Sequence, residues 1–536
     1  MSLPVSLGFW IMAFIPIGML LFLMIKVQLP AFRAAPISLA IAIFVGVFFY
    51  KSGANLIINE LLKALWNSLS IILVIITALL IYEVTNEAKA FSSIKKNLEE
   101  IAPNELVRIL GLGMVFVSFL QGVTGFGVPV AVTAPLLIEM GVLPLWAVVI
   151  PLIGHSWAGT YGTLAVAWSS LVTQTGIEGN ILNQSGFYAG MFLWIINILS
   201  GLSICWFYGK DKGVKKGLFA VLIFSFIQGG GQLLLTQVNG IIANFLPGCI
   251  ALLGFIVVNK IPMYKESWNI DKSQIMNRNK SQVFSKASVD IKLYESFFPY
   301  IVMTILTLVL LINPKIKGVL TNFSIGPNFP RTSTEYGFVN SQIIKYAPFA
   351  PLVHPSTFLL ISALAGYIFY LKKGYIEIGK LNSIFKEVVK KTIPSSIAII
   401  SLTMMSKVMS GTGQIDVLAI GASNILGKNY GFIAPFIGLV GSFITSSNMS
   451  SNILFSNFQF TTAELLSLHQ GVILGAQTGG AAIGTAIAPN NIVLGATTSN
   501  ILGEEGKILK AILPFALGII LCFGIITYFS ATYMSL

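Results

Sequence analysis

The sequence predicts an all-α polytopic membrane protein with about twelve transmembrane helices plus two re-entrant helical hairpins, arranged as two inverted repeats. Three observations support this fold class. Of the 536 residues, 55% are hydrophobic and 10% are charged, whereas charged residues make up about 25% of soluble domains. Apolar runs of about 20 residues, the length that crosses a bilayer, recur along the chain. Two longer apolar regions, 106–138 and 430–465, are each interrupted midway by polar residues or glycines.

The twelve predicted spans follow the apolar runs in chain order. The first run has no basic stretch before it and no small-residue cleavage site close after it, so we interpret it as a retained span rather than a signal peptide. The spans are expected at 7–26, 36–50, 64–82, 142–168, 186–208, 216–235, 240–259, 295–313, 355–371, 392–410, 466–488 and 508–531. The stretches 89–100 and 375–390 are predicted to be amphipathic helices at the membrane surface.

The connecting loops differ strongly in charge. Four lysines lie in 210–216, seven basic residues in 260–293 and six lysines in 372–391, whereas 169–185 and 235–240 contain no basic residue. With twelve spans and two hairpins, the basic loops all fall on one side of the membrane. Because basic loops stay in the cytoplasm, that side is predicted to be cytoplasmic and both termini to lie outside. The same bias explains the net charge of +13 without a nucleic-acid partner.

A weak internal repeat relates the two halves of the chain. Gly46 and Gly366 match at an offset of 320, Ser118-Phe119 and Ser442-Phe443 at 324, and Gly162-Thr163 and Gly484-Thr485 at 322. We therefore divide the chain into a first repeat (1–208, with hairpin 106–138), a connecting segment (209–294, two spans and a basic cytoplasmic loop) and a second repeat (295–536, with hairpin 430–465). The loop charges orient the two repeats oppositely, so their hairpins enter from opposite faces.

The polar breaks in the two hairpins are the candidate functional site. In lipid, irregular backbone is tolerated only where protein covers it or water reaches it, and paired broken segments are typical of transport sites. Half-helix N-termini at such breaks attract a carboxylate without a full cation. The alternative is that the glycines only permit close helix packing. The tip residues are Gly122, Gly125 and Gly127 in the first hairpin, and Thr445, Ser446, Ser447 and Asn448 in the second.

His155 is the residue we interpret as the candidate proton acceptor. It lies in the run 153–163 near the predicted midplane, and an ionisable group inside the membrane is by default a functional hypothesis. Imidazole titrates near pH 6.5, so it is suited to carry a coupling proton. The alternative is a neutral histidine satisfied by a backbone carbonyl. Gln477 and Thr478 lie in the matching stretch of the second repeat and are suited to hydrogen-bond a hydroxy acid from the opposite side.

The sequence distinguishes between three classes of membrane protein. A secondary carrier requires paired breaks and inverted repeats, and no nucleotide-binding motif is present in the sequence. A passive anion channel is not excluded, although two inverted hairpins favour alternating access. A membrane enzyme would require a cluster of acid, base or metal ligands, and the sequence predicts neither a cofactor nor a metal site. Oligomerisation is left open.

Two stretches resemble signatures of the lactate permease family of secondary carriers. They are Phe-Leu-Gln-Gly-Val-Thr-Gly-Phe-Gly-Val-Pro-Val-Ala-Val (119–132) and Gly-Ser-Phe-Ile-Thr-Ser-Ser-Asn-Met-Ser-Ser-Asn-Ile-Leu-Phe (441–455). The resemblance covers most of the chain and implies a proton-coupled carrier of lactate or a related short monocarboxylate such as glycolate in the cell membrane. Many members have a glutamate where this chain has Gln121, and a different run where it has Gly154-His155-Ser156-Trp157.

The resulting functional expectation is transport of lactate or a related 2-hydroxy monocarboxylate by proton symport. A sodium-coupled carrier of another small organic anion and a passive anion channel remain as alternatives. A dicarboxylate would be expected to recruit arginine, and neither signature contains one. His155 is the expected proton-coupling residue, and the expected substrate-binding residues are Gln121, Gly122, Thr124, Gly125, Gly127, Ser156, Tyr161, Thr445, Ser446, Ser447, Asn448, Gln477 and Thr478.

Overall fold

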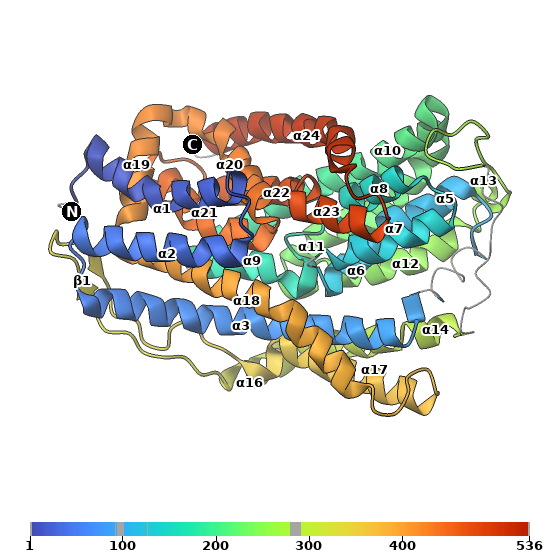
Figure 1. Ribbon diagram of the computed structural model, residues 1–536, viewed down its shortest axis with the longest axis horizontal. Coiled ribbons are helices and arrows are strands. Elements are labelled where there is room, and N and C mark those ends of the chain that lie inside the picture. Colours follow the sequence, from blue (N-terminus) through green and yellow to red (C-terminus); the bar gives the residue numbers. More distant parts are fainter. Residues whose placement is uncertain are drawn as a thin grey trace.

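The computed structural model describes residues 3–91, 93, 101–125, 127–278, 291–312 and 314–533. Within these ranges the chain is built almost entirely of helices, many of which run along the long axis of the molecule (Figure 1). Both termini lie toward the left-hand end of Figure 1, whereas α13 and α14 lie at the opposite end. Most of the predicted surface helix 89–100 falls outside the described residues.

The first half of the chain contains three long helices followed by several shorter, interrupted ones. The helices are α1 (Leu7–Ile25), α2 (Ala31–Phe48), α3 (Ala54–Glu87), α5 (Glu105–Leu110), the π-helix η1 (Gly111–Phe116), α6 (Val117–Val123), α7 (Val128–Glu139), α8 (Pro144–Ser156) and α9 (Gly162–Thr175). The connecting segment contains α10 (Gly179–Ser225), η2 (Phe226–Gly230), α11 (Gly231–Thr236), η3 (Gly240–Ile242), α12 (Phe245–Val258) and α13 (Pro262–Lys265).

The second half also combines long helices with shorter, interrupted ones, and it contains one long insertion between α16 and α17. The helices are α14 (Leu293–Ser296), α15 (Phe298–Thr307), η4 (Leu308–Ile312), α16 (Pro314–Asn322), η5 (Pro351–Val353), α17 (Pro355–Lys372), α18 (Leu381–Gly411), α19 (Gln414–Leu426), η6 (Gly427–Asn429), α20 (Tyr430–Thr445), α21 (Asn448–Leu465), α22 (Gln470–Ala486), α23 (Pro489–Thr498) and α24 (Glu505–Tyr533). Two short antiparallel strands, β1 (Thr332–Ser333) and β2 (Val339–Asn340), lie in the insertion.

The longest helical run, α10, folds back on itself. Its backbone leaves the helical region at Gly209 and Lys210. A Cβ atom on Gly201 would lie 2.6 Å from Val221, and one on Gly190 would lie 2.9 Å from Leu233 in α11, so the two arms run antiparallel. These arms correspond to the predicted spans 186–208 and 216–235. The predicted surface helix 375–390 differs: α18 begins at Leu381 and continues as one helix through the predicted span.

The two ends of each broken apolar region lie close together. For 105–139, Glu105 N–H donates to the Trp268 carbonyl (3.1 Å), and Leu143 N–H donates to the Ile275 carbonyl (2.8 Å). Both ends of this region therefore lie beside the 268–275 segment. For 430–465, His469 N–H donates to the Ala531 carbonyl, and Gly431 packs against the backbone of Tyr528, so both ends lie beside the C-terminal end of α24.

The number of membrane crossings depends on how the interrupted helices are counted. Among the described residues, ten helical runs are long and apolar enough to cross a membrane. There are eleven if Phe298–Leu311 and Lys315–Asn322, which meet at 88°, form one span. The multi-span helical class is thus confirmed. The count of twelve spans and the re-entrant character of the two hairpins stay predictions.

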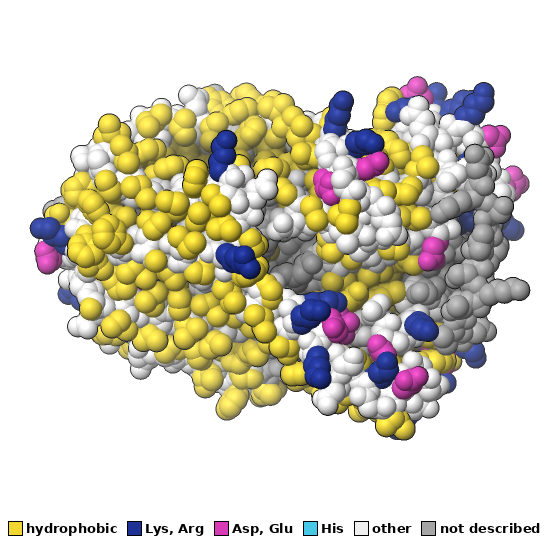
Figure 2. Space-filling view, viewed as in Figure 1, with side chains coloured by type: hydrophobic (Ala, Val, Ile, Leu, Met, Phe, Trp, Pro, Cys, Tyr) yellow, Lys and Arg dark blue, Asp and Glu magenta, His cyan; other side chains and the backbone are white. Residues whose placement is uncertain are grey.

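The exterior is apolar over most of the face in Figure 2. Large apolar side chains such as Phe48, Leu62 and Ile393 are exposed there or elsewhere on the surface, as expected for helices that face lipid. Charged side chains gather mostly toward the right-hand end of Figure 2, where Figure 1 places α13 and α14. This segregation matches the clustering of basic residues in the loops of the sequence.

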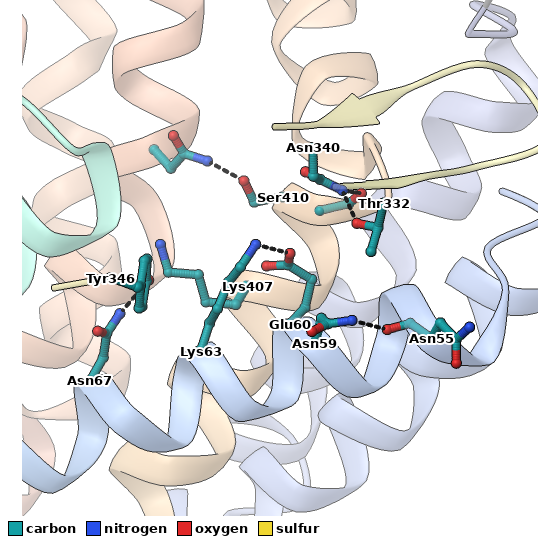
Figure 3. A network of polar contacts seen from close by, with 12 residues as sticks. Asn55, Asn59, Glu60, Lys63, Asn67, Thr332, Asn340, Tyr346, Lys407 and Ser410 are labelled. Carbon is teal, nitrogen blue, oxygen red and sulfur yellow. Dashed lines mark hydrogen bonds and ion pairs between the residues drawn. The ribbon is translucent and has the colours of Figure 1, made fainter. Parts of the chain in front are cut away.

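The insertion 323–354 is fastened to α3 and α18 by polar contacts (Figure 3). Asn67 Nδ2 donates to Tyr346 Oη (2.8 Å), and Asn340 Nδ2 donates to the Gly411 carbonyl (2.8 Å). Beneath it, Lys63 Nζ lies 2.6 Å from Glu60 Oε1, and the two side chains are only 6% and 4% exposed. This ion pair lies between α3, α18 and the insertion, and the sequence offered no signal for it.

Two further ion pairs hold helix ends in place. Lys391 pairs with Glu83 across the α3–α18 contact. At the start of the second half, Glu295 accepts hydrogen bonds from Lys373 Nζ (2.9 Å) and Tyr375 Oη (2.8 Å). These donors hold the pKa of the Glu295 carboxyl at about 2, well below its usual value of 4.5. The pair ties α14 to the end of α17.

Candidate functional site

Four helix breaks meet near the middle of the molecule and enclose a cavity of about 70 Å³. The breaks separate α6 from α7, α8 from α9, α20 from α21, and α22 from α23 (Figure 1). Each break presents the C-terminus of one half-helix and the N-terminus of the next. The lining residues are Gln121, Gly127, His155, Gly159, Gly162, Thr163, Val166, Ala167, Ser446, Ser447, Asn448, Met449, Thr485 and Asn491.

The α6–α7 break requires glycine for two separate reasons. Gly125 (φ +60°) and Gly127 (φ +82°) adopt left-handed backbone conformations that favour glycine. Neighbouring side chains also leave no room for a methyl group, since a Cβ on Gly125 would lie 2.4 Å from Thr163 Oγ1, and one on Gly127 would lie 2.4 Å from Leu494 Cδ2. Both positions, 125 and 127, therefore require glycine. The turn that these glycines form brings Gln121 and the start of α7 to the cavity.

The α20–α21 break is built from hydroxyl and amide side chains. Ser446 takes a left-handed conformation (φ +57°), and its buried Oγ has no hydrogen-bond partner among the described residues. Ser447 Oγ accepts from Ser450 N–H (3.2 Å) and so caps the N-terminus of α21. The first N–H groups of α21 have no partner within the helix. A buried hydroxyl without a partner is costly, so the Ser446 side chain is suited to a ligand in the cavity.

His155 lines the cavity from the C-terminus of α8. Its Nδ1 lies 2.6 Å from the Pro151 carbonyl, an atom that can only accept, so Nδ1 carries a proton in the neutral ring. The remaining nitrogen, Nε2, is then an acceptor with no partner among the described residues. The carbonyl bond that the sequence raised as an alternative role is therefore present, but it occupies only one of the two ring nitrogens.

Behind the cavity, polar contacts join breaks from the two halves of the chain. Thr160 Oγ1 lies 2.9 Å from Thr478 Oγ1, and Asn448 Nδ2 donates to Thr160 Oγ1 (3.1 Å). On the far side, Asn491 Nδ2 donates to the Thr485 carbonyl (2.9 Å) across the α22–α23 break. These bonds hold four elements from both halves of the chain in one arrangement around the cavity.

The structure brings six of the sequence-predicted residues to the cavity: Gln121, Gly127, His155, Ser446, Ser447 and Asn448. The others lie around it. Gly122 packs against Asn244 and Phe245 of α12, and Gly125 faces Thr163. The hydroxyls of Thr124, Ser156 and Thr445 donate to carbonyls of their own helices. Tyr161 Oη donates to the Gly186 carbonyl. Gln477 hydrogen-bonds to Ser451 and Gln459, and Thr478 belongs to the network behind the cavity.

Sequence reasoning missed eight of the lining residues, including Gly162, Thr163, Thr485 and Asn491. A signal for three of them existed. Gly162-Thr163 and Gly484-Thr485 were matched as a repeat, but this match was used only to align the halves. Asn491 lies in the first turn of α23 after Pro489, in a stretch that was assigned to no span.

The electrostatics of the cavity come from helix ends rather than charged side chains. None of the described lining residues is a lysine, arginine, aspartate or glutamate. The N-termini of α7, α21 and α23 lie at the breaks and carry partial positive charge, and the C-termini of α6, α8, α20 and α22 lie there too and carry partial negative charge. At about 70 Å³ the cavity is larger than the roughly 10–15 Å³ needed to hold one water, so it has room for a small ligand. The arrangement suits a small anion.

Comparison with known proteins identifies the family. The model of the L-lactate permease family matches residues 10–534, nearly the whole chain. The chain belongs to the L-lactate permease family. This confirms the resemblance that was inferred from the stretches 119–132 and 441–455. The family makes the chain a permease rather than an enzyme, and a multi-pass protein of the cell membrane.

Individual relatives are similar over almost their full length. The L-lactate permease of Halalkalibacterium halodurans is 23% identical over 523 residues, which cover 96% of this chain and 95% of that protein. The glycolate permease GlcA and the L-lactate permease of Escherichia coli are each 25% identical, over 558 and 554 residues, with 97% of this chain covered. A crystal structure of the Alcanivorax borkumensis YdaH transporter matches with a TM-score of 0.40 and 12% identity, covering 85% of this chain and 84% of the other.

Proposed function

We propose that this permease carries lactate, or a related short 2-hydroxy monocarboxylate such as glycolate, across the cell membrane by proton symport with alternating access. The central cavity is the observation that carries this proposal. It is small, at about 70 Å³, and hydroxyl and amide side chains from two helix breaks line it, which favours a small polar substrate. Relatives of this permease are named for lactate and for glycolate.

The lining supports a monocarboxylate that also carries a hydroxyl group. The N-termini of α7, α21 and α23 attract one negative charge, and they do so without an arginine that would favour a second carboxylate. Ser446 Oγ is free to hydrogen-bond the substrate, since it has no partner among the described residues, and Gln121 lines the same cavity. We propose Gln121, Ser446, Ser447 and Asn448 as the substrate-binding residues closest to the anion.

His155 is the proposed carrier of the coupling proton. With Nδ1 occupied by the Pro151 carbonyl, Nε2 is the nitrogen left to take up a proton. A protonated ring and a carboxylate in the same cavity neutralise each other, which lowers the cost of carrying either charge through the membrane. Proton and substrate would then bind and leave together.

The two hairpins supply the proposed gates. The two ends of each hairpin lie close together, and the tips of both border the cavity. In an arrangement of twelve spans, two inverted repeats and two re-entrant hairpins, movement of one tip opens the cavity to one side while the other stays closed. This is the geometry that alternating access requires.

Labelled lactate uptake into proteoliposomes tests the proposal. Accumulation against a lactate gradient is expected when the external pH is lowered, with competition by glycolate and little competition by succinate. An imposed sodium gradient that drives uptake instead would replace proton coupling by sodium coupling, for which the backbone carbonyls at the C-termini of α6, α8, α20 and α22 are suitable ligands. Equilibration without uphill accumulation under either gradient would indicate a channel.

The role of His155 is tested separately. His155→Gln keeps a hydrogen-bonding side chain but cannot be protonated, so uptake driven by a pH gradient should be lost while exchange of labelled for unlabelled lactate is retained. His469→Gln is the matched control, because His469 caps α22 and does not line the cavity. Full pH-driven accumulation in His155→Gln would remove this residue from proton coupling.

A further inference from the structure

A second cavity of about 240 Å³ adjoins the central one. One wall is Ser70 and Val74 of α3, another is Leu164, Val166 and Ser169 of α9, and the end of the insertion 323–354 closes it together with the first residue of α17. Val166 lines both cavities. The first turns of α9 are therefore the partition between the two spaces, and we call the second one the side cavity.

The partition has an unusual backbone. Thr163, Leu164 and Ala165 all have positive φ values of 49°, 49° and 66°. A left-handed conformation costs a residue with a side chain about 1–2 kcal/mol, and such strain gathers at sites that change conformation. Thr163 borders the central cavity and Leu164 the side cavity. A change in this turn therefore alters the wall of both spaces at once.

The side cavity carries polar groups and reaches the surface. His354 Nε2 lies 2.8 Å from Ser70 Oγ, while its Nδ1 accepts a hydrogen bond from Ser356 N–H (3.4 Å). Nδ1 also lies 2.7 Å from Ser356 Oγ, so both ring nitrogens of His354 have hydrogen-bond partners. Ser169, which is exposed, marks the point where the cavity opens. An imidazole and two hydroxyls are groups that a small carboxylate can contact on its way inward.

We infer that the side cavity is a substrate vestibule and that the strained turn 163–166 is the barrier between it and the central site. The inference rests on the proposed function, since it assigns the monocarboxylate a route to that site. The vestibule holds the anion transiently through neutral donors, and the displacement of Val166 admits it to the helix N-termini beyond. The insertion 323–354, fastened to α3 (Figure 3), holds one wall of the vestibule in place.

Cysteine modification tests the route. In a background where Cys249 and Cys522 are replaced by alanine, Ser169→Cys is treated with a bulky, membrane-impermeant methanethiosulfonate, and lactate uptake into proteoliposomes is measured. Modification should lower uptake by about tenfold or more, because the attached group fills the vestibule mouth. Thr175→Cys is the matched control: it lies on the same helix and lines neither cavity, and its modification should leave uptake within about twofold.

A second variant reports on the partition itself. Lactate should slow the modification of Val166→Cys by about threefold or more, because a substrate in the central cavity covers this side chain, and should not slow that of Ser169→Cys. Uptake that persists after full modification of Ser169→Cys, an inert Ser169→Cys, or an unprotected Val166→Cys would each overturn the vestibule. Failure of the unmodified permease to take up lactate would instead overturn the proposed function, so the two failures are distinguishable.

Discussion

Replacing one member of the buried Glu60–Lys63 pair should destabilise the permease severely, and replacing both should not. The two side chains are 4% and 6% exposed, and their charged atoms are 2.6 Å apart. At an effective dielectric constant of about 20 the gross attraction at this distance is about 6 kcal/mol, most of which offsets the cost of removing both charges from water. Glu60→Leu leaves an uncompensated ammonium group and should lower the free energy of unfolding by about 3–5 kcal/mol.

The double variant Glu60→Leu/Lys63→Met distinguishes the loss of the ion pair from the cost of one buried, unpaired charge. Neither charge then remains to be desolvated. The free energy of unfolding of this double variant should therefore lie within about 1 kcal/mol of the wild-type value and should be higher than that of either single variant. Titration with sodium dodecyl sulfate, followed by tryptophan fluorescence, measures these free energies on the purified permease in detergent.

A surface pair with the same spacing provides the control. Lys507 and Glu504 are also three residues apart, with a distance of 3.0 Å between charged atoms, but their side chains are 67% and 39% exposed. Glu504→Leu should therefore change the unfolding free energy by less than about 1 kcal/mol. A double variant that is less stable than Glu60→Leu, or equal losses for Glu60→Leu and Glu504→Leu, would refute the reasoning from burial.

Two further predictions concern the cavity glycines and acid stability. Gly127→Ala should abolish lactate uptake, since it adds a methyl group to a tight left-handed turn, whereas Gly176→Ala, with φ +69° and open space around it, should retain uptake at a cost of about 1 kcal/mol in stability. Loss of uptake in both variants would mean that a strained backbone alone abolishes transport, without any crowding of the added methyl group. Glu295→Gln should lower the melting temperature near pH 7. The advantage of the wild type should shrink below about pH 4.5 and vanish as pH falls through about 2, because a lowered pKa stabilises the fold only while the carboxyl is ionised; a gap independent of pH would contradict this.

Much of the architecture can be predicted from the order of apolar and polar segments in the sequence. The breaks at Gly122–Gly127 and Thr445–Asn448 could be located because clustered glycines, hydroxyls and amides interrupt an apolar run, and irregular backbone in a membrane must be covered by protein or water. The turn within α10 was expected from the lysines at 210–216, which cannot remain in the bilayer. Signals of this kind are local, so no knowledge of the neighbouring helices is needed to interpret them.

The residues that line the cavity could be predicted less completely. Gln477 was expected at the substrate because it is polar within an apolar span, yet it hydrogen-bonds Ser451 and Gln459 inside the second half. Thr163 and Asn491 were not expected there, although both border the cavity. In helices that are apolar on every face, the sequence period does not indicate which face meets which neighbour. Only the packing of the four breaks decides it.

By itself, the sequence determined that this is a many-spanning helical membrane protein with two matched polar breaks, because composition and loop charge reflect the bilayer directly. The tertiary structure alone decided which half-helix ends converge on the cavity, which nitrogen of His155 stays available, and that Glu60 and Lys63 are buried together beneath a distant insertion. These features depend on contacts between residues hundreds of positions apart, and such contacts leave no periodic trace in the chain.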